Sequence, residues 1–284
     1  MTNINPKAIF TIAKKEFLDN IRNKWIIVLT VIFVLLVIVF SYVAGGQTGG
    51  EETFGGMQNT VLGLISISSL LIPLIALILG FSTISGEAES GALYVVLSYP
   101  VRRIEILLGK LLGLGSVIVV SVFLGFGLGG IAIAATVGPE SWAGYIGFML
   151  LSIFMGFIYL SLSICISAYC KRRITSIGGV LLVFFWGMIY GTVFLAILYA
   201  TGSSIEDFLT GNIPDWFFNS VVFSPGDLHQ TAVMRVFGME TIDAMGISVT
   251  IPEFLSMNFL LVVHIIWFIV PLFLAYFFFK RRDI

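Results

Sequence analysis

The chain has 284 residues, of which 58% are hydrophobic and only 11% charged, and its mean hydropathy is +1.05. A soluble domain carries roughly 25% charged residues, so this composition argues against a water-soluble fold. The net charge of −1 argues against a nucleic-acid partner. The apolar runs are long and continuous rather than alternating, which sets aside an outer-membrane barrel. We therefore predict an all-α integral membrane protein that lies in the lipid bilayer.

An amphipathic segment precedes the first apolar run. Within residues 7–24, Phe10, Ala13, Phe17 and Ile21 recur at steps of three and four, the spacing of one helix face. This pattern predicts an interfacial helix at the membrane surface. Such a helix either anchors the first span or packs against a cytoplasmic partner.

Six apolar runs are long enough to cross a bilayer, which takes about 20 residues of helix. The predicted spans of this single transmembrane domain, residues 1–284, are 25–43, 61–83, 104–137, 143–170, 174–200 and 259–279. Two longer connections separate them, residues 84–103 between spans two and three and residues 201–258 between spans five and six.

The basic residues indicate how the chain is oriented. Of the 15 Lys and Arg residues, all except Arg235 fall on one side of the six-span arrangement. Because cytoplasmic flanks carry an excess of Lys and Arg, both termini are predicted to lie in the cytoplasm, with the chain in the cell membrane.

The connection at 84–103 carries two acidic residues, an apolar turn and then the sequence Pro-Val-Arg-Arg. Glu87 and Glu89 are two residues apart, so on a helix they point in roughly opposite directions, which argues against a paired acid and base. We predict that they are surface contacts for a partner. Alternatively, Glu87 simply favours the dipole of a helix that begins there.

Three stretches of this region carry a resemblance to a known family. The runs Glu-Ala-Glu-Ser-Gly-Ala-Leu at 87–93, Leu-Ser-Tyr-Pro-Val-Arg-Arg at 97–103 and Leu-Leu-Gly-Lys at 107–110 resemble the cytoplasmic signature of type-2 ABC transporter permeases, particularly the NosY-like branch. The amphipathic start and the outer sequence Ser-Pro-Gly-Asp at 224–227 are also similar to that family. Ala92 departs from the threonine that the family often has, and His229 from a more basic residue.

The resemblance implies the membrane subunit of an ABC transporter, which is not itself an enzyme and would export a substrate that the sequence does not name. It also implies a fold with a short coupling helix between spans two and three and an outer helical segment between spans five and six. ATP and Mg²⁺ would be bound by two copies of a separate cytoplasmic ATPase, since no Gly-x-x-x-x-Gly-Lys-Ser/Thr motif occurs here. A second copy of the chain would complete the permease. The residues implied to contact the ATPase are Lys14, Lys15, Glu16, Glu87, Glu89, Gly91, Leu93, Pro100, Arg102 and Arg103.

Other residues are candidates for roles within the membrane and outside it. An ionisable group inside a span is a functional candidate, so His264 is a candidate for the transport path, although it could also only bond a neighbour. The aromatic residues of 201–258 predict short helices on the outer leaflet, which would cap the dimer or bind a substrate or an extracytoplasmic partner. The two cysteines, Cys165 and Cys170, imply neither a disulfide framework nor a zinc site.

Three other classes of function compete with a permease. An ion-driven secondary transporter usually has charged residues or interrupted helices near the middle of the membrane, and its sequence usually contains inverted repeats. This sequence shows neither feature. A membrane scaffold is a further alternative. A glutamate-type intramembrane protease is suggested by Glu51 and Glu52, but the pair falls in an outer loop and Gly56 occupies the position of the arginine that such an enzyme needs.

Overall fold

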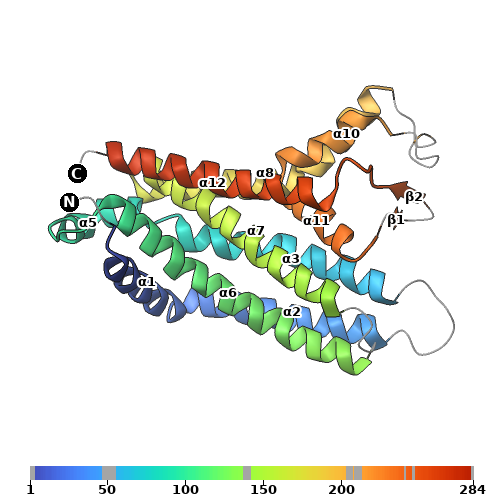
Figure 1. Cartoon of the computed structure of the whole chain (residues 1–284), viewed down its shortest axis with the longest axis horizontal. Coiled ribbons are helices and arrows are strands. Elements are labelled where there is room, and N and C mark those ends of the chain that lie inside the picture. Colours follow the sequence, from blue (N-terminus) through green and yellow to red (C-terminus); the bar gives the residue numbers. More distant parts are fainter. Residues whose placement is uncertain are drawn as a thin grey trace.

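The computed structural model describes residues 4–46, 56–136, 142–202, 207, 213–239, 241–244 and 247–282. Its long helices run side by side along the long axis of the molecule, and both chain termini lie at the same end of this bundle (Figure 1). We call that end the terminal end and the opposite one the far end. Glu51 and Glu52 lie outside the described residues.

Among the described residues, six helices are long and apolar enough to cross a membrane, which confirms the six predicted spans by length and composition. They are α2 (Lys24–Gly46), α3 (Gly56–Gly80), α6 (Arg103–Thr136), α7 (Trp142–Tyr169), α8 (Arg173–Ala200) and α12 (Met257–Arg281). Continuous apolar sequence forms helix in a membrane because each backbone N–H then finds its acceptor within the same segment.

Three short helices lie at the terminal end. Helix α1 (Pro6–Ile21) begins at Asn5, whose side chain accepts a hydrogen bond from the N–H of Lys7. The 84–103 connection holds two helices, α4 (Ser85–Glu89) and α5 (Ala92–Leu97), rather than the one predicted. The chain turns between them at Gly91, whose φ of +78° is a left-handed conformation that favours glycine.

Three of the four residues on the predicted face of α1, Ala13, Phe17 and Ile21, are partly buried, and Phe17 packs against the hydrophobic core. Phe10 is exposed, whereas Glu16 is buried and Ile12 packs against the hydrophobic core. The helix therefore presents Ile12 and Glu16 to the bundle and leaves Phe10 on its outward side. On the packed side, the Glu16 carboxylate meets a buried cation on α6, described below.

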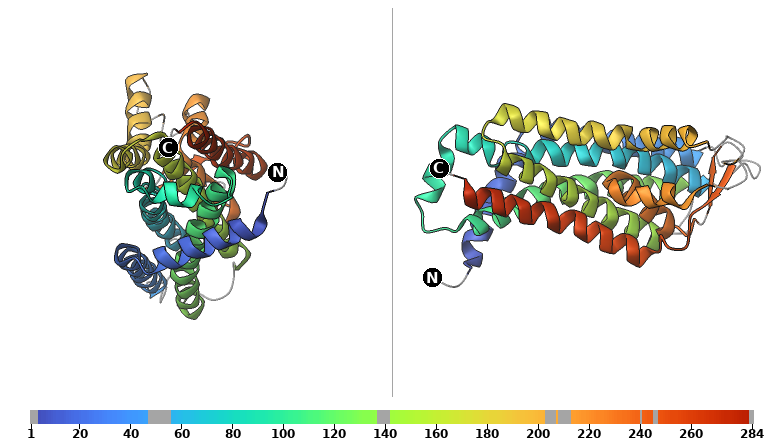
Figure 2. Two further views of the ribbon diagram at one scale, coloured as in Figure 1. Left: turned by 90° about the vertical axis from the view of Figure 1, so that its left-hand side faces the viewer. Right: turned by 90° about the horizontal axis from the view of Figure 1, so that it is seen from above.

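The far end contains α10 (Asp215–Ser220), the 3₁₀ turn η1 (Val221–Phe223), α11 (Pro225–Val236) and an antiparallel pair of strands, β1 (Thr241–Ala244) and β2 (Ile247–Thr250). The prediction of a wholly helical outer segment was wrong for the two strands, where β-branched residues favour extended backbone. Helix α11 returns toward the bundle and packs against α7 and α12 (Figures 1 and 2). Its buried face holds Leu228, His229 and Val233.

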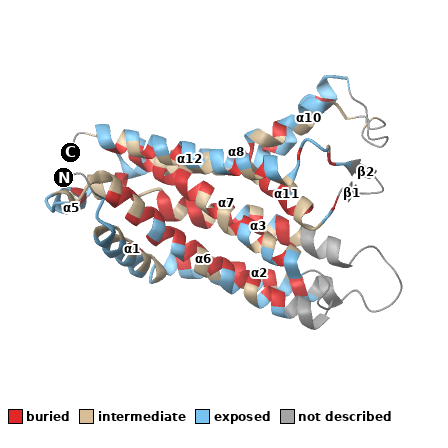
Figure 3. Ribbon diagram, viewed as in Figure 1, coloured by how far each residue is buried: buried red, intermediate tan, exposed pale blue. Residues whose placement is uncertain are grey.

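The buried residues concentrate on the central helices. Helix α7 contacts α3, α6, α8, α11 and α12, and buried positions run along the facing sides of α3, α6 and α7 (Figure 3). The outward faces of α2, α8 and α12 expose large apolar side chains, as expected where a helix contacts lipid.

Candidate functional site at the terminal end

A buried ion cluster joins three helices at the terminal end. Lys110 of α6 is only 2% exposed, and its Nζ donates hydrogen bonds to Glu16 Oε1 of α1 at 2.8 Å and to Glu87 Oε1 of α4 at 2.6 Å. Such a cluster is favourable only while every partner is present, because each charge has lost its water. Glu87 Oε2 is buried without a hydrogen-bond partner. The cluster thus ties the connection at 84–103, which holds α4 and α5, to α1 and α6. We call this connection the coupling segment, after its predicted role.

The environment of this cluster also affects Lys15, which lies beside it on α1. Burial acts to lower the pKa of Lys15, but the carboxylates of Glu16, Glu87 and Asp19 outweigh that effect, so the pKa is raised. The ammonium group of Lys15 is 3.7 Å from Glu16 Oε1 and 3.5 Å from Asp19 Oδ2. Lys15 therefore stays positively charged at the surface over the buried pair.

The coupling segment is also fastened to the helices behind it. Glu89 Oε2 accepts a hydrogen bond of 2.7 Å from the backbone N–H of Arg173, the first residue of α8. A carboxylate there stabilises the positive end of the helix dipole. Ser167 Oγ near the end of α7 accepts hydrogen bonds of 3.0 Å from the N–H groups of Ile84 and Ser85. Helix α4 is therefore bonded to α7 and α8 as well as to α6.

Two arginines donate hydrogen bonds to carbonyl groups at the ends of α12 and α7, at the terminal end of the bundle. Arg103 at the start of α6 donates to the carbonyl oxygens of Phe279 at 2.5 Å and of Lys280 at 2.7 Å, at the end of α12. Arg282 donates to carbonyl oxygens at the end of α7, including that of Cys170 at 3.0 Å. The last carbonyls of a helix have no intrahelical donor, so these guanidinium groups satisfy them.

Helices α1 and α6 approach each other closely at two glycines. A Cβ atom at Gly113 would lie 2.5 Å from the carbonyl oxygen of Ala13, and one at Gly109 would lie 2.7 Å from the Cβ of Ile12. Two glycines four residues apart lie on the same face of α6, and because they lack side chains they allow α1 to approach closely. This contact places Glu16 within reach of Lys110.

The outward side of the coupling segment remains uncovered in the single chain. Tyr94, Val95 and Tyr99 are 56%, 61% and 65% exposed, whereas Leu93, just before Tyr94, is fully buried and packs α5 against the bundle. We call Tyr94, Val95 and Tyr99 the α5 surface. It is an apolar and aromatic patch at the terminal end, the composition that is enriched at protein interfaces.

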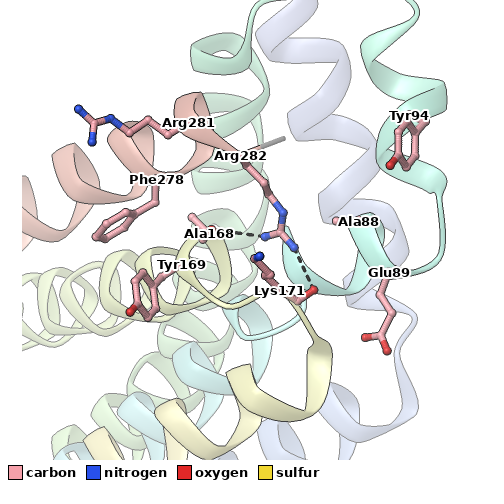
Figure 4. Close-up of a pocket in the computed structure, with 9 residues that line it drawn as sticks. All are labelled: Ala88, Glu89, Tyr94, Ala168, Tyr169, Lys171, Phe278, Arg281 and Arg282. Atoms are coloured by element: carbon pink, nitrogen blue, oxygen red, sulfur yellow. Dashed lines mark hydrogen bonds between the residues drawn. The ribbon is translucent and has the colours of Figure 1, made fainter. Parts of the chain in front are cut away.

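A cavity of about 420 Å³ lies beside the α5 surface. It is bounded by α4, α5 and the ends of α7 and α12, and it combines aromatic rings with charges of both signs (Figure 4). Its lining residues are Ala88, Glu89, Tyr94, Ala168, Tyr169, Lys171, Phe278, Arg281 and Arg282. Within the described part of the chain, no group of three or more His, Cys, Asp or Glu residues could hold a metal ion.

The ten residues predicted to contact an ATPase differ in their exposure and in their contacts. Lys14, Lys15 and Pro100 are exposed. The side chains of Glu16, Glu87 and Arg103 bond within the protein. The contact of Glu87 with a partner stays a prediction. Three more have structural positions: Gly91 turns the chain, Leu93 is buried and Glu89 binds the start of α8. Arg102 is half-buried and donates its N–H to Glu105.

Sequence reasoning missed Lys110 as the centre of this arrangement. A lysine seven residues into a long apolar helix was an available signal, since a charge at such a position needs a partner. His264 is fully buried, its Nδ1 lies 2.8 Å from the Leu260 carbonyl oxygen and its ring stacks on Phe154. It lines neither the cavity beside α5 nor a second cavity among α3, α7, α8 and α11. Its role in a transport path stays a prediction.

The sequence is similar to known transporter proteins. The profile of the family described as "ABC-2 family transporter protein" matches residues 10–284. A protein of Pseudomonas aeruginosa named "Probable ABC transporter permease protein NosY" is 39% identical over 133 residues, 47% of this chain and 48% of the relative. A protein of the same name from Stutzerimonas stutzeri is 37% identical over 129 residues, 45% of this chain and 46% of the relative. The chain thus aligns with about half the length of these relatives. With a profile match over residues 10–284 and six span-length apolar helices, the chain is a multi-pass membrane protein that belongs to the ABC-2 family of transporter permeases.

Proposed function

We propose that this chain is the permease subunit of an ABC transporter, in which ATP hydrolysis by a separate cytoplasmic ATPase drives transport. The observation that carries the proposal is that the coupling segment has an exposed apolar surface on α5 and hydrogen bonds from α4 to the spans. Its α5 surface is exposed, while the partly buried Glu87 and the exposed Glu89 on α4 are hydrogen-bonded to α6 and α8. The names of the two relatives, both permeases, support the same function.

In this proposal the ATPase binds the α5 surface, and the exposed residues Lys14, Lys15 and Pro100 flank the contact. Movement of α5 would pass to α4 through the short turn at Gly91. From α4 it would reach three spans through hydrogen bonds, to α6 at Lys110, to α8 at Arg173 and to α7 at Ser167. Glu87 and Glu89 are then positioning residues of the coupling segment.

The assembly we propose has two permease chains and two ATPase chains, with ATP and Mg²⁺ bound by the ATPases. The terminal end would lie in the cytoplasm, because it carries all of the Lys and Arg residues except Arg235. Transport of the substrate would run outward. The far-end segment from α10 to β2 would then face the outside, where it is available to an extracytoplasmic partner.

Reconstitution of the full chain with its ATPase tests the α5 surface. The double substitution Tyr94→Ser and Val95→Asp should weaken copurification of the ATPase about tenfold, since exposed aromatic and apolar residues at the centre of an interface dominate binding. Tyr199→Ser is the matched control, because Tyr199 is an exposed tyrosine near the far end of α8. Equal copurification by both variants would contradict the proposal.

The hydrogen bonds from α4 to the spans predict a second kind of defect. A variant that loses such a bond should still bind the ATPase but transmit its movement poorly. Glu87→Gln keeps the shape of the side chain but removes the charge that faces Lys110. We expect the ATPase to copurify as with the natural sequence while stimulation of its ATP hydrolysis by the permease falls. Unchanged stimulation would count against the coupling role, and robust gradient-driven uptake by the chain alone would favour a secondary transporter instead.

A further inference from the structure

A second cavity, of about 220 Å³, lies where four helices meet. Helix α3 contributes Ser69 and Pro73, α7 contributes Tyr159, α8 contributes Phe184, and α11 contributes Asp227 and Gln230. None of these residues belongs to the terminal-end site. Tyr159 and Pro73 lie well inside their helices, so the cavity lies within the bundle, where α11 returns toward it.

Asp227, in the first turn of α11, brings a carboxylate to this cavity. Its Oδ2 is buried without a hydrogen-bond partner. No Lys or Arg is among the residues that line the cavity. Arg235, on the same helix, points elsewhere and donates to the carbonyl oxygens of Ile251 and Pro252. A buried carboxylate oxygen that makes no bond is costly, which indicates that it is kept for a partner absent from the single chain.

The other groups in the cavity also favour a cation. The Ser69 hydroxyl is buried without a partner. Pro73, four residues further along α3, has no N–H, so the Ser69 carbonyl lacks the donor that a helix normally gives it. Tyr159 and Phe184 add aromatic rings, whose faces attract cations. The cavity thus offers oxygen acceptors and aromatic faces around one carboxylate.

We propose that this cavity binds a small organic cation that carries an ammonium group, with Asp227 as its counter-ion. A single carboxylate is too few for a divalent metal ion, which prefers several charged oxygen ligands. The volume exceeds that of one bare monovalent ion, and the aromatic rings suit an alkylated ammonium. Binding at this site needs no ATPase, so the inference stands or falls separately from the proposed function.

The protonation of Asp227 gives the site a pH dependence. Burial raises the pKa of Asp227, and hydrogen bonds from the Ser224 side chain and from its own backbone N–H oppose this only in part. Tyr159 on α7, which lines the cavity, and Tyr190 on α8 are the titratable residues that interact electrostatically with Asp227 in the described part of the chain. A cation binds the charged carboxylate, so its affinity should fall as the pH drops through the raised pKa of Asp227.

Equilibrium dialysis of the purified full chain in detergent tests the site, with radiolabelled tetramethylammonium and methylammonium as the probes. We expect saturable binding that weakens about tenfold or more in Asp227→Asn, because a buried charge pair loses one partner. Asp215→Asn is the matched control, since Asp215 is an exposed acid of the same far-end segment. Gel filtration and thermal unfolding verify that both variants are folded.

Two further measurements test whether the bound probe occupies the Asp227 site. Tyr159→Phe, which keeps the ring, should retain binding, and mild acidification should weaken it in the natural sequence but not change the residual binding of Asp227→Asn. The inference is overturned if the natural sequence binds neither ammonium saturably, or if Asp227→Asn binds as tightly. It is also overturned if sodium displaces the probes at equal concentration, which would assign the cavity to an inorganic ion.

Discussion

Lys110 shows how one side chain can decide the arrangement of several elements. Its ammonium group lies between two carboxylates that come from different helices, and it is almost fully withdrawn from solvent. The attraction within such a group is strong because the surroundings screen it little. Removal of the cation alone leaves two buried like charges, which repel each other and have lost their hydration.

Lys110→Met should therefore lower the free energy of unfolding by about 3 kcal/mol or more. The triple variant Lys110→Met, Glu16→Gln, Glu87→Gln should recover most of that loss, since no unpaired charge remains. Thermal and denaturant unfolding in detergent measure both. Lys14→Met, at an exposed lysine of α1, should change the free energy of unfolding little. If it lowered that free energy as much as Lys110→Met does, the buried ion cluster would not explain the loss.

His229 makes stability dependent on pH. Burial in α11 lowers its pKa to about 3, with a smaller contribution from His264, so the folded protein holds this ring neutral. The unfolded chain takes up a proton below about pH 6.5. Stability is thus complete above that pH and falls as the pH drops toward the folded pKa, by about 1.4 kcal/mol per pH unit. His229→Leu should show a weaker fall between neutral pH and about pH 5, measured by thermal unfolding. An unchanged profile would contradict the assignment.

At the scale of elements, glycine placement decides which helices can touch. Helix α6 contains several glycines, but they are not equivalent. Gly109 and Gly113 face α1 with no room for a further atom, whereas Gly127 has nothing within 4 Å of an added Cβ. Close approach of another helix to α6 is thus confined to particular glycines.

This difference supplies a matched pair of substitutions. Gly113→Ala adds a methyl group against the Ala13 backbone, which cannot move without shifting α1, so we expect a loss of about 1 to 3 kcal/mol. Gly127→Ala adds the same atom to open space and should be neutral or slightly stabilising through helix propensity. Thermal unfolding of the two purified variants compares them directly. A larger loss in Gly127→Ala would show that α1 does not pack as described.

At the scale of the whole molecule, both chain termini and the coupling segment share one end of the bundle (Figure 1). The charge distribution predicts that this end is cytoplasmic. Single cysteines can test it in a background with Cys165 and Cys170 replaced by serine. On intact cells, an impermeant maleimide should label Asn219→Cys in α10, and it should label Tyr94→Cys in α5 only after the membrane is opened. The reverse pattern would place the terminal end outside.

The sequence alone determined the six spans, because continuous apolar runs of that length leave the backbone no option but helix in lipid. It also placed the break between spans two and three, where polar residues and Gly91 interrupt the apolar pattern. It could not determine that Glu16 and Glu87 turn inward, since their partner Lys110 lies 94 and 23 residues away. Nor could it place Asp227 beside Tyr159 and Ser69. Local pattern fixes which residues form a helix, but the tertiary structure decides which faces meet, because that depends on packing between segments far apart in the chain.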